Sequence, residues 1–287
     1  MMWLAEALAR LPLAWLHAIG SVAGIVVYRL SGRYAKRLRE NLRQSGVVPD
    51  ADYRAVLRAN VREAGKGVLE LPWVWLRPYV TVLAGVRRCL GWEHVEAAHA
   101  QGKGVIFLTP HLGCFEMLSL YIAQRHPMTS MYRPPRQAFL DRMMLRGRQR
   151  GQVTLAPADM SGVRLLLKAL RRGECIGILP DQAPGNGEGV WVPFFGRPAY
   201  TMTLFGRLLA ASKAPVILCH SVRLPHGQGY DLHFAPLAFD PAQAAEPQLN
   251  AALERLIRTC PEQYLWSYNR YKVPRGANPP RDVESEA

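Results

Sequence analysis

The stretch GVIFLTPHLGCFE, residues 104–116, places a short apolar run directly before a turn and the start of a helical pattern. An uninterrupted apolar run of this length is typical of a strand that is buried on both faces. The same order returns where the helical pattern SGVRLLLKALRRG (161–173) leads into ECIGILP (174–180). Strands that alternate with helices in this way predict a parallel sheet covered on both faces.

Outward from this stretch, the same two patterns account for most of the chain beyond residue 100. Short apolar runs bounded by Gly, Pro or polar residues predict further strands, and longer amphipathic segments predict helices. The fold class is therefore predicted to be α/β, a single domain with a mostly parallel central sheet flanked by helices. The other expected strands are 128–133, 153–156, 214–224 and 230–237, and the expected helices are 51–71, 114–124, 136–149, 161–173, 201–212 and 246–260.

The composition is that of a globular protein, with 49% hydrophobic and 20% charged residues among 287. A mean hydropathy of −0.06 excludes a protein that crosses a membrane many times. The five cysteines are scattered, without a CxxC pair or a His/Cys cluster at ligand spacing. The sequence therefore predicts no disulfide framework, no metal site and no cofactor.

The net charge is strongly positive, because 36 Lys and Arg face 22 Asp and Glu to give +14. Such a field attracts anions: nucleic acid, anionic lipid headgroups, phosphorylated substrates or acidic proteins. The chain lacks zinc-finger, ribonucleoprotein and other nucleic-acid motifs, so no nucleic-acid partner is expected.

The N-terminal region contains LPLAWLHAIGSVAGIVVY (11–28), a run without a formal charge that is long enough to span a bilayer. A cluster of cations follows, and such clusters mark the cytoplasmic side and bind anionic headgroups. We expect residues 1–45 to be a hydrophobic membrane-anchor helix with a basic flank, either spanning or lying in the interface, before a domain at 46–275 and a disordered tail at 276–287. A buried core helix is the alternative. The cations are Arg29, Arg33, Lys36, Arg37, Arg39 and Arg43.

His111 and Glu116 are the sharpest local feature. His111 follows a buried strand, at the edge of a parallel sheet where α/β proteins place their sites. Glu116 should lie at the start of the next helix, where its carboxylate could bond one ring nitrogen of His111 and leave the other as a general base. The HxxxxE spacing by itself fits a structural histidine as well.

Three further residues are candidates for substrate binding. Arg133 and Arg148 lie near the ends of predicted elements, where guanidinium groups could contact phosphate. Asp181 opens the glycine-rich loop DQAPGNGEG (181–189), which allows a ligand to approach the backbone closely. A GxSxG elbow, a Walker A motif and a GxGxxG fingerprint are missing from the sequence, which argues against serine hydrolases, P-loop enzymes and dinucleotide-binding enzymes.

Taken in order, these segments resemble the bacterial lipid A late acyltransferases of the lauroyl/myristoyl type, within the HxxxxD/E glycerolipid acyltransferase superfamily. The resemblance covers roughly residues 1 to 275. It implies that His111 and Glu116 are the catalytic pair, with Arg148 and Asp181 in the site and Arg133 supporting them. Glu116 stands where most glycerolipid acyltransferases carry Asp. The motifs are PHLGCFE (110–116), MYRPPRQAFLD (131–141), LRGRQR (145–150), LPDQAPGNGEGVWVPFFGRPAYT (179–201) and PEQYLWSYNRYK (261–272).

The resemblance also implies the reaction and its partners. An acyl chain would pass from acyl–acyl carrier protein to a hydroxyl of a 3-hydroxyacyl chain on a lipid A precursor that carries keto-deoxy-octulosonate, at the cytoplasmic side of the inner membrane. Two alternatives stay open: an acyltransferase for a lysophospholipid or an aminoacyl lipid, with acyl-CoA as donor, and a non-catalytic protein that binds anionic membranes. The acyl chain requires an apolar tunnel, whose candidate lining residues are Trp73, Trp75, Phe115 and Met117. The segment 261–272 is expected to pack back against the sheet, with substrate contact as the alternative.

Overall fold

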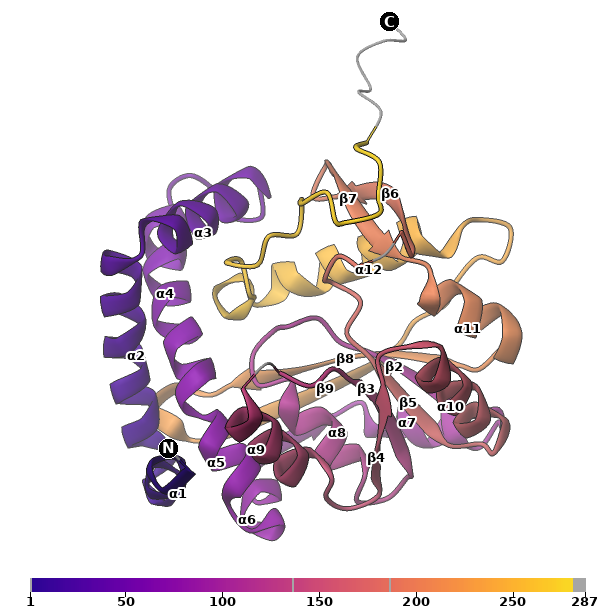
Figure 1. The fold of residues 1–287 in the computed structure, drawn as a ribbon, viewed down its shortest axis with the longest axis horizontal. Coiled ribbons are helices and arrows are strands. Elements are labelled where there is room, and N and C mark those ends of the chain that lie inside the picture. The colour runs from indigo at the N-terminus through magenta and orange to yellow at the C-terminus, as the bar shows by residue number, and fades with distance from the viewer. Residues whose placement is uncertain (1, 136, 186, 281–287) are drawn as a thin grey trace, which may run out of the picture.

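A computed structural model describes residues 2–135, 137–185 and 187–280. Its centre is a seven-stranded sheet in the order β1-β9-β8-β2-β5-β3-β4 (Figure 1). Every neighbouring pair is parallel except β8 and β9. The prediction of an α/β fold with a mostly parallel sheet is confirmed. The strands are β1 (Val86–Leu90), β2 (Val105–Leu108), β3 (Met128–Tyr132), β4 (Val153–Pro157), β5 (Cys175–Ile178), β8 (Val216–Arg223) and β9 (Tyr230–Pro236).

Two hydrophobic cores cover the faces of this sheet. Successive residues of β2 point to opposite faces, so Phe107 enters one core while Ile106 and Leu108 enter the other. The core around Phe107 contains residues of α5 (Leu71–Leu76), α6 (Tyr79–Leu83), α7 (Trp92–His99), α8 (Glu116–Ile122) and α9 (Ala138–Arg148). The core around Ile106 contains residues of α10 (Met160–Arg171), α11 (Leu204–Ser212) and α12 (Ala245–Thr259).

The segment after the glycine-rich loop forms a separate antiparallel hairpin of β6 (Gly189–Phe194) and β7 (Arg197–Met202). The helix expected at 201–212 therefore begins only at Leu204. The C-terminal segment contains a short 3₁₀ turn, η2 (Pro261–Gln263), and then runs without regular structure beside α4 (Tyr53–Leu69) and α3 (Gly32–Gln44). Side-chain amides hold it there: Asn60 donates to the carbonyl of Tyr264 at 2.8 Å. Of the tail expected at 276–287, residues 281–287 lie outside the described part of the chain.

The apolar N-terminal run forms α2 (Leu13–Leu30), which follows the short helix α1 (Met2–Arg10) and is long and apolar enough to cross a membrane. It lies along α4 (Figure 1). The contact is a seam of glycines, since a Cβ added to Gly24 would lie 2.2 Å from the carbonyl oxygen of Val61, and one added to Gly65 would lie 2.0 Å from that of Gly20. One face of α2 is thus packed tightly against the rest of the protein.

Candidate active site

The sheet register brings His111 to Asp181. Leu108 and Ile178 are partners in the parallel pair β2 and β5, and each site residue lies three positions beyond its strand end. The Asp181 Oδ1 atom lies 2.8 Å from Nδ1 of His111, and Oδ2 accepts the backbone N–H of His111 at 3.0 Å. One buried carboxylate therefore fixes both the backbone and the ring of the histidine.

The charge of Asp181 makes it a suitable hydrogen-bond acceptor for the imidazole of His111. Its side chain is almost completely buried, and burial alone would raise its pKa. The neighbouring His111 ring and N–H outweigh burial, so the pKa of Asp181 is lowered and the group stays ionised. An ionised Oδ1 accepts the proton on Nδ1, which leaves the Nε2 lone pair of His111 facing Gln182, whose Nε2 lies 3.3 Å away.

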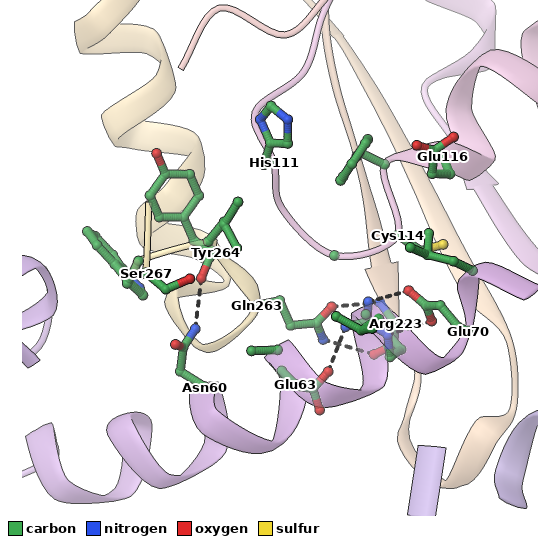
Figure 2. A pocket seen from close by; sticks show the side chains of 18 of the residues that line it. Asn60, Glu63, Glu70, His111, Cys114, Glu116, Arg223, Gln263, Tyr264 and Ser267 are labelled. Carbon is green, nitrogen blue, oxygen red and sulfur yellow. Dashed lines mark hydrogen bonds and ion pairs between the residues drawn. The ribbon is translucent and has the colours of Figure 1, made fainter. Parts of the chain in front are cut away.

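The sequence predicted that Glu116 bonds the ring of His111, but in the structure the Glu116 carboxylate bonds other side chains. Its Oε2 accepts the indole N–H of Trp75 at 3.1 Å and Nε–H of Arg148 at 2.9 Å, and its Oε1 accepts a second bond from Arg148. The reason is local, because α8 begins at Glu116 and directs its side chain towards α5 and α9. Figure 2 shows Glu116 and His111 separated along the loop that joins them. The carboxylate that bonds the imidazole is Asp181.

The two candidate arginines differ in environment. Arg148 ends α9, as expected, and lies in the site. Burial alone would lower its pKa, but the Glu116 carboxylate outweighs burial and raises it, so the pair is ionic. At least two of its donors are committed to Glu116 rather than to a phosphate. Arg133 is exposed and lies where β3 leads into the next loop, on the rim of a cavity.

Two cavities meet at these residues. The first, here called the helix-side cavity, has a volume of about 300 Å³ and lies between α4, the 111–116 loop and residues 263–267 (Figure 2). The second, here called the strand-side cavity, has a volume of about 550 Å³ and is lined by β2, β3, β5, α8, α9 and residues 182–185. Both have the size of ligand sites. The residues that line both cavities are His111, Phe115, Glu116 and Arg148.

Of the residues expected to line a tunnel, Trp75 and Phe115 line these cavities. Trp73 and Met117 belong to the buried core and are absent from both cavity walls. The segment 261–272 was assigned to packing, yet Tyr264, Leu265, Trp266 and Ser267 form part of the helix-side wall.

The 111–116 loop is anchored at Gly113. Its φ of +58° is left-handed, and an added Cβ would lie 1.8 Å from the carbonyl oxygen of Ser221, so only glycine fits. The backbone N–H groups of Gly113 and Cys114 donate to the carbonyls of Gln263 and Ser221 at 3.0 and 3.1 Å. Burial, followed by the nearby Glu70, raises the pKa of Cys114 well above its ordinary value. The thiol in this motif is therefore protonated and a poor nucleophile.

A buried charge cluster under the helix-side cavity was missed by the sequence analysis. Arg223 donates to Oε2 of Glu70 and to Oε2 of Glu63, each at 2.8 Å, and Glu70 also lies 3.0 Å from Nε2 of His17 on α2. Burial would raise the pKa of Glu70, but Arg223 and His17 lower it to about 2. The seven-residue spacing of Glu63 and Glu70 put them on one helix face, whereas nothing local marked Arg223 as their partner.

Comparison with known proteins agrees with the motifs. The profile of the family described as bacterial lipid A biosynthesis acyltransferase matches residues 1–273. The lipid A biosynthesis lauroyltransferase of Escherichia coli (strain K12) is 27% identical over 278 residues, 95% of this chain and 89% of the relative. The lipid A biosynthesis palmitoleoyltransferase of the same strain is 27% identical over 275 residues, 92% of this chain and 87% of the relative.

A more distant similarity extends to another lipid. The phosphatidylinositol mannoside acyltransferase of Mycobacterium tuberculosis (strain ATCC 25618 / H37Rv) is 25% identical over 208 residues, 69% of this chain and 64% of the relative. The family profile nevertheless spans nearly the whole chain, and the relatives named above share the transfer of acyl groups. The chain belongs to the bacterial lipid A biosynthesis acyltransferase family and is an acyltransferase.

Proposed function

We propose that this protein moves a fatty acyl chain from acyl–acyl carrier protein to a hydroxyl of a 3-hydroxyacyl chain on a lipid A precursor that carries keto-deoxy-octulosonate. The family and the names of its lipid A relatives support this acceptor. The observation that carries the proposal is the position of His111, whose ring is bonded by Asp181 at the junction of two cavities.

The proposed step is a direct transfer. Nε2 of His111 takes the proton of the acceptor hydroxyl as the oxygen attacks the thioester carbonyl carbon, and the substrate hydroxyl replaces the contact with Gln182. The new C–O bond forms, the C–S bond breaks, and the proton passes from His111 to the leaving thiolate. Asp181 stabilises the transient imidazolium. No covalent acyl-enzyme is needed, which agrees with the protonated state of the buried Cys114 thiol.

Glu116 remains a proposed member of the catalytic site. Its carboxylate lines both cavities beside His111, and its bonds hold Arg148 at the junction and Trp75 in the wall of the helix-side cavity. We propose that Glu116 holds Arg148 and the cavity walls in place. Arg133, exposed on the rim of the strand-side cavity, is proposed to contact anionic groups of a substrate.

The charge distribution suits these partners. The net charge of +14 attracts the phosphates of the acceptor, an acidic carrier protein and an anionic membrane surface. Because the inner face of α2 is packed on α4, we propose that α2 lies in the plane of the cytoplasmic leaflet of the inner membrane rather than crossing it. Its outer face and α1 carry exposed apolar side chains for that contact: Trp3, Leu4, Trp15, Ile19, Val22, Val26, Val27 and Leu30.

The test is product analysis by mass spectrometry with the purified full-length protein. It would be offered acyl–acyl carrier protein or acyl-CoA, and as acceptor a lipid A precursor, lysophosphatidate or phosphatidylinositol mannoside. We expect transfer from the carrier protein to the lipid A precursor. Transfer to one of the other lipids alone would replace this proposal by the second candidate, a different lipid acceptor, which the similarity to the mannoside enzyme supports.

A further inference from the structure

We propose that the helix-side cavity binds the hydrocarbon chain of the acceptor, while the strand-side cavity binds the acyl chain of the donor. The inference rests on the proposed function and deepens it. A reaction between two molecules that each carry a long apolar chain needs two apolar sites that meet at the base. The two cavities share His111 and diverge from it, one towards α4 and the other along the strands.

The wall of the helix-side cavity suits a chain rather than a headgroup. Its apolar surface comes from Ala64, Val68 and Leu71 on one side and from Leu265 and Trp266 on the other. The charged side chains of this wall bond one another and so offer little to an external phosphate. Arg223 pairs with Glu63 and Glu70, and Arg148 pairs with Glu116.

The position of this cavity also assigns the chain to the acceptor. On one face of helix α4, Val61 and Gly65 contact α2. On another face, Asn60, Ala64 and Gly67 line the cavity. A single helix therefore separates the proposed lipid-contacting segment from the site. Val68 lines the cavity although 62% of it is exposed, so the cavity reaches the surface at this residue. A chain that belongs to a membrane lipid has a route into the cavity there.

The strand-side cavity has the features that a chain delivered by a soluble carrier needs. It is the larger of the two, and its apolar part includes Phe107, Ile122 and Val153. Its rim instead carries the exposed cation Arg133. A cation at the mouth complements a phosphate-bearing linker on an acidic carrier protein.

The experiment fills each cavity in turn. Ala64→Phe narrows the helix-side cavity and Ser119→Phe narrows the strand-side cavity. The full-length protein in vesicles would be assayed with lipid A precursors of increasing hydroxyacyl length and with carrier-protein thioesters of increasing acyl length. We expect Ala64→Phe to weaken use of the longest acceptors by about 15-fold, since excluding two methylene groups costs about 1.6 kcal/mol. Its donor-length profile should match the wild type, and Ser119→Phe should show the reverse.

Val68→Trp provides a second variant, because this exposed position tolerates a large side chain without disturbing the core. It should raise the acceptor KM and leave the donor KM unchanged. The inference is overturned if either helix-side variant alters the donor profile, or if both leave the acceptor profile unchanged while the thermal unfolding curve stays that of the wild type. A wild-type protein that acylates no lipid A precursor would instead overturn the proposed function, and the two failures are therefore distinguishable.

Discussion

Asp181 bonds His111 twice, once at ring Nδ1 and once at the backbone N–H. Both contacts follow from the register of β2 and β5, which sets the two residues at equivalent positions beyond neighbouring strand ends. The orientation and the tautomer of the imidazole are therefore fixed before a substrate arrives. In the proposed mechanism, the base is therefore preorganised.

Replacement of His111 tests the base directly. We expect His111→Ala to reduce kcat/KM by about 10²–10⁴-fold, since the acceptor hydroxyl loses its proton acceptor. The thermal unfolding temperature should change little. His94→Ala, at an exposed histidine outside the site, is the matched control and should retain wild-type turnover. Wild-type activity in His111→Ala would contradict the mechanism.

Asp181→Asn and Glu116→Gln separate the two carboxylates. In Asp181→Asn the ring loses the negative partner that stabilises the imidazolium in the proposed mechanism, so kcat/KM should fall by about 10²–10⁴-fold. Glu116→Gln should lower kcat/KM less, because it loosens Arg148 but leaves the bond between Asp181 and His111 intact. Steady-state kinetics of both variants measure this, and a larger loss in Glu116→Gln than in Asp181→Asn would favour the histidine–glutamate pairing predicted from the sequence.

Removal of Arg223 tests the buried cluster. Arg223→Met leaves Glu63 and Glu70 without their cation, and we expect the free energy of unfolding to fall by about 3–5 kcal/mol. Urea denaturation would measure it. Arg172→Met breaks an exposed pair with Glu174 and should have little effect on stability. Equal stabilities of the two variants would show that the cluster is not structural.

The acid stability of the protein should depend on Glu70. Its folded pKa of about 2 lies below the ordinary value of 4.5, so ionised Glu70 stabilises the fold above pH 4.5, and this stabilisation is lost as the pH falls towards 2. Glu70→Gln should be less stable than the wild type at pH 7 and should lose less stability on acidification. Urea unfolding across this pH range measures both slopes, and parallel slopes would contradict the assignment.

The outer face of α2 should govern membrane binding. We expect Trp15→Ser combined with Val22→Ser to weaken sedimentation with vesicles that contain phosphatidylglycerol, because both exposed apolar side chains lose their contact with lipid. Met160→Ser, which removes an exposed apolar side chain on α10, should bind as the wild type does. A double variant that still binds fully would place the membrane contact elsewhere.

The sequence predicted the elements whose side chains are buried on both faces. All residues of β2 and β5 are buried, so each appears as an apolar run. Strand β1 was missed because Arg87 and Arg88 are exposed at the sheet edge and interrupt any such run. The β6–β7 hairpin was missed because Pro193 lies inside its first strand, where proline is unfavourable.

The candidate site residues were each named from the sequence, but their contacts were not. His111 and Asp181 were each identified at a strand end. In the structure His111 lines the cavities, and Asp181 bonds His111. Their contact depends on β2 lying beside β5, which is a property of the sheet order and leaves no local signal. Glu116 was paired with His111 from the spacing and from the family resemblance, whereas in the structure α8 directs the Glu116 side chain to Trp75 and Arg148.

The glycine seam between α2 and α4 bears on any attempt to prepare a shortened, water-soluble form of this enzyme. Cutting the chain after Leu30 would remove His17, and with it one bonding partner of the buried Glu70 carboxylate. It would also expose the backbone of α4 at Val61 and Gly65 to solvent. Residues 2–30 are thus part of the folded scaffold, and truncation would damage the floor of the site together with the proposed lipid contact.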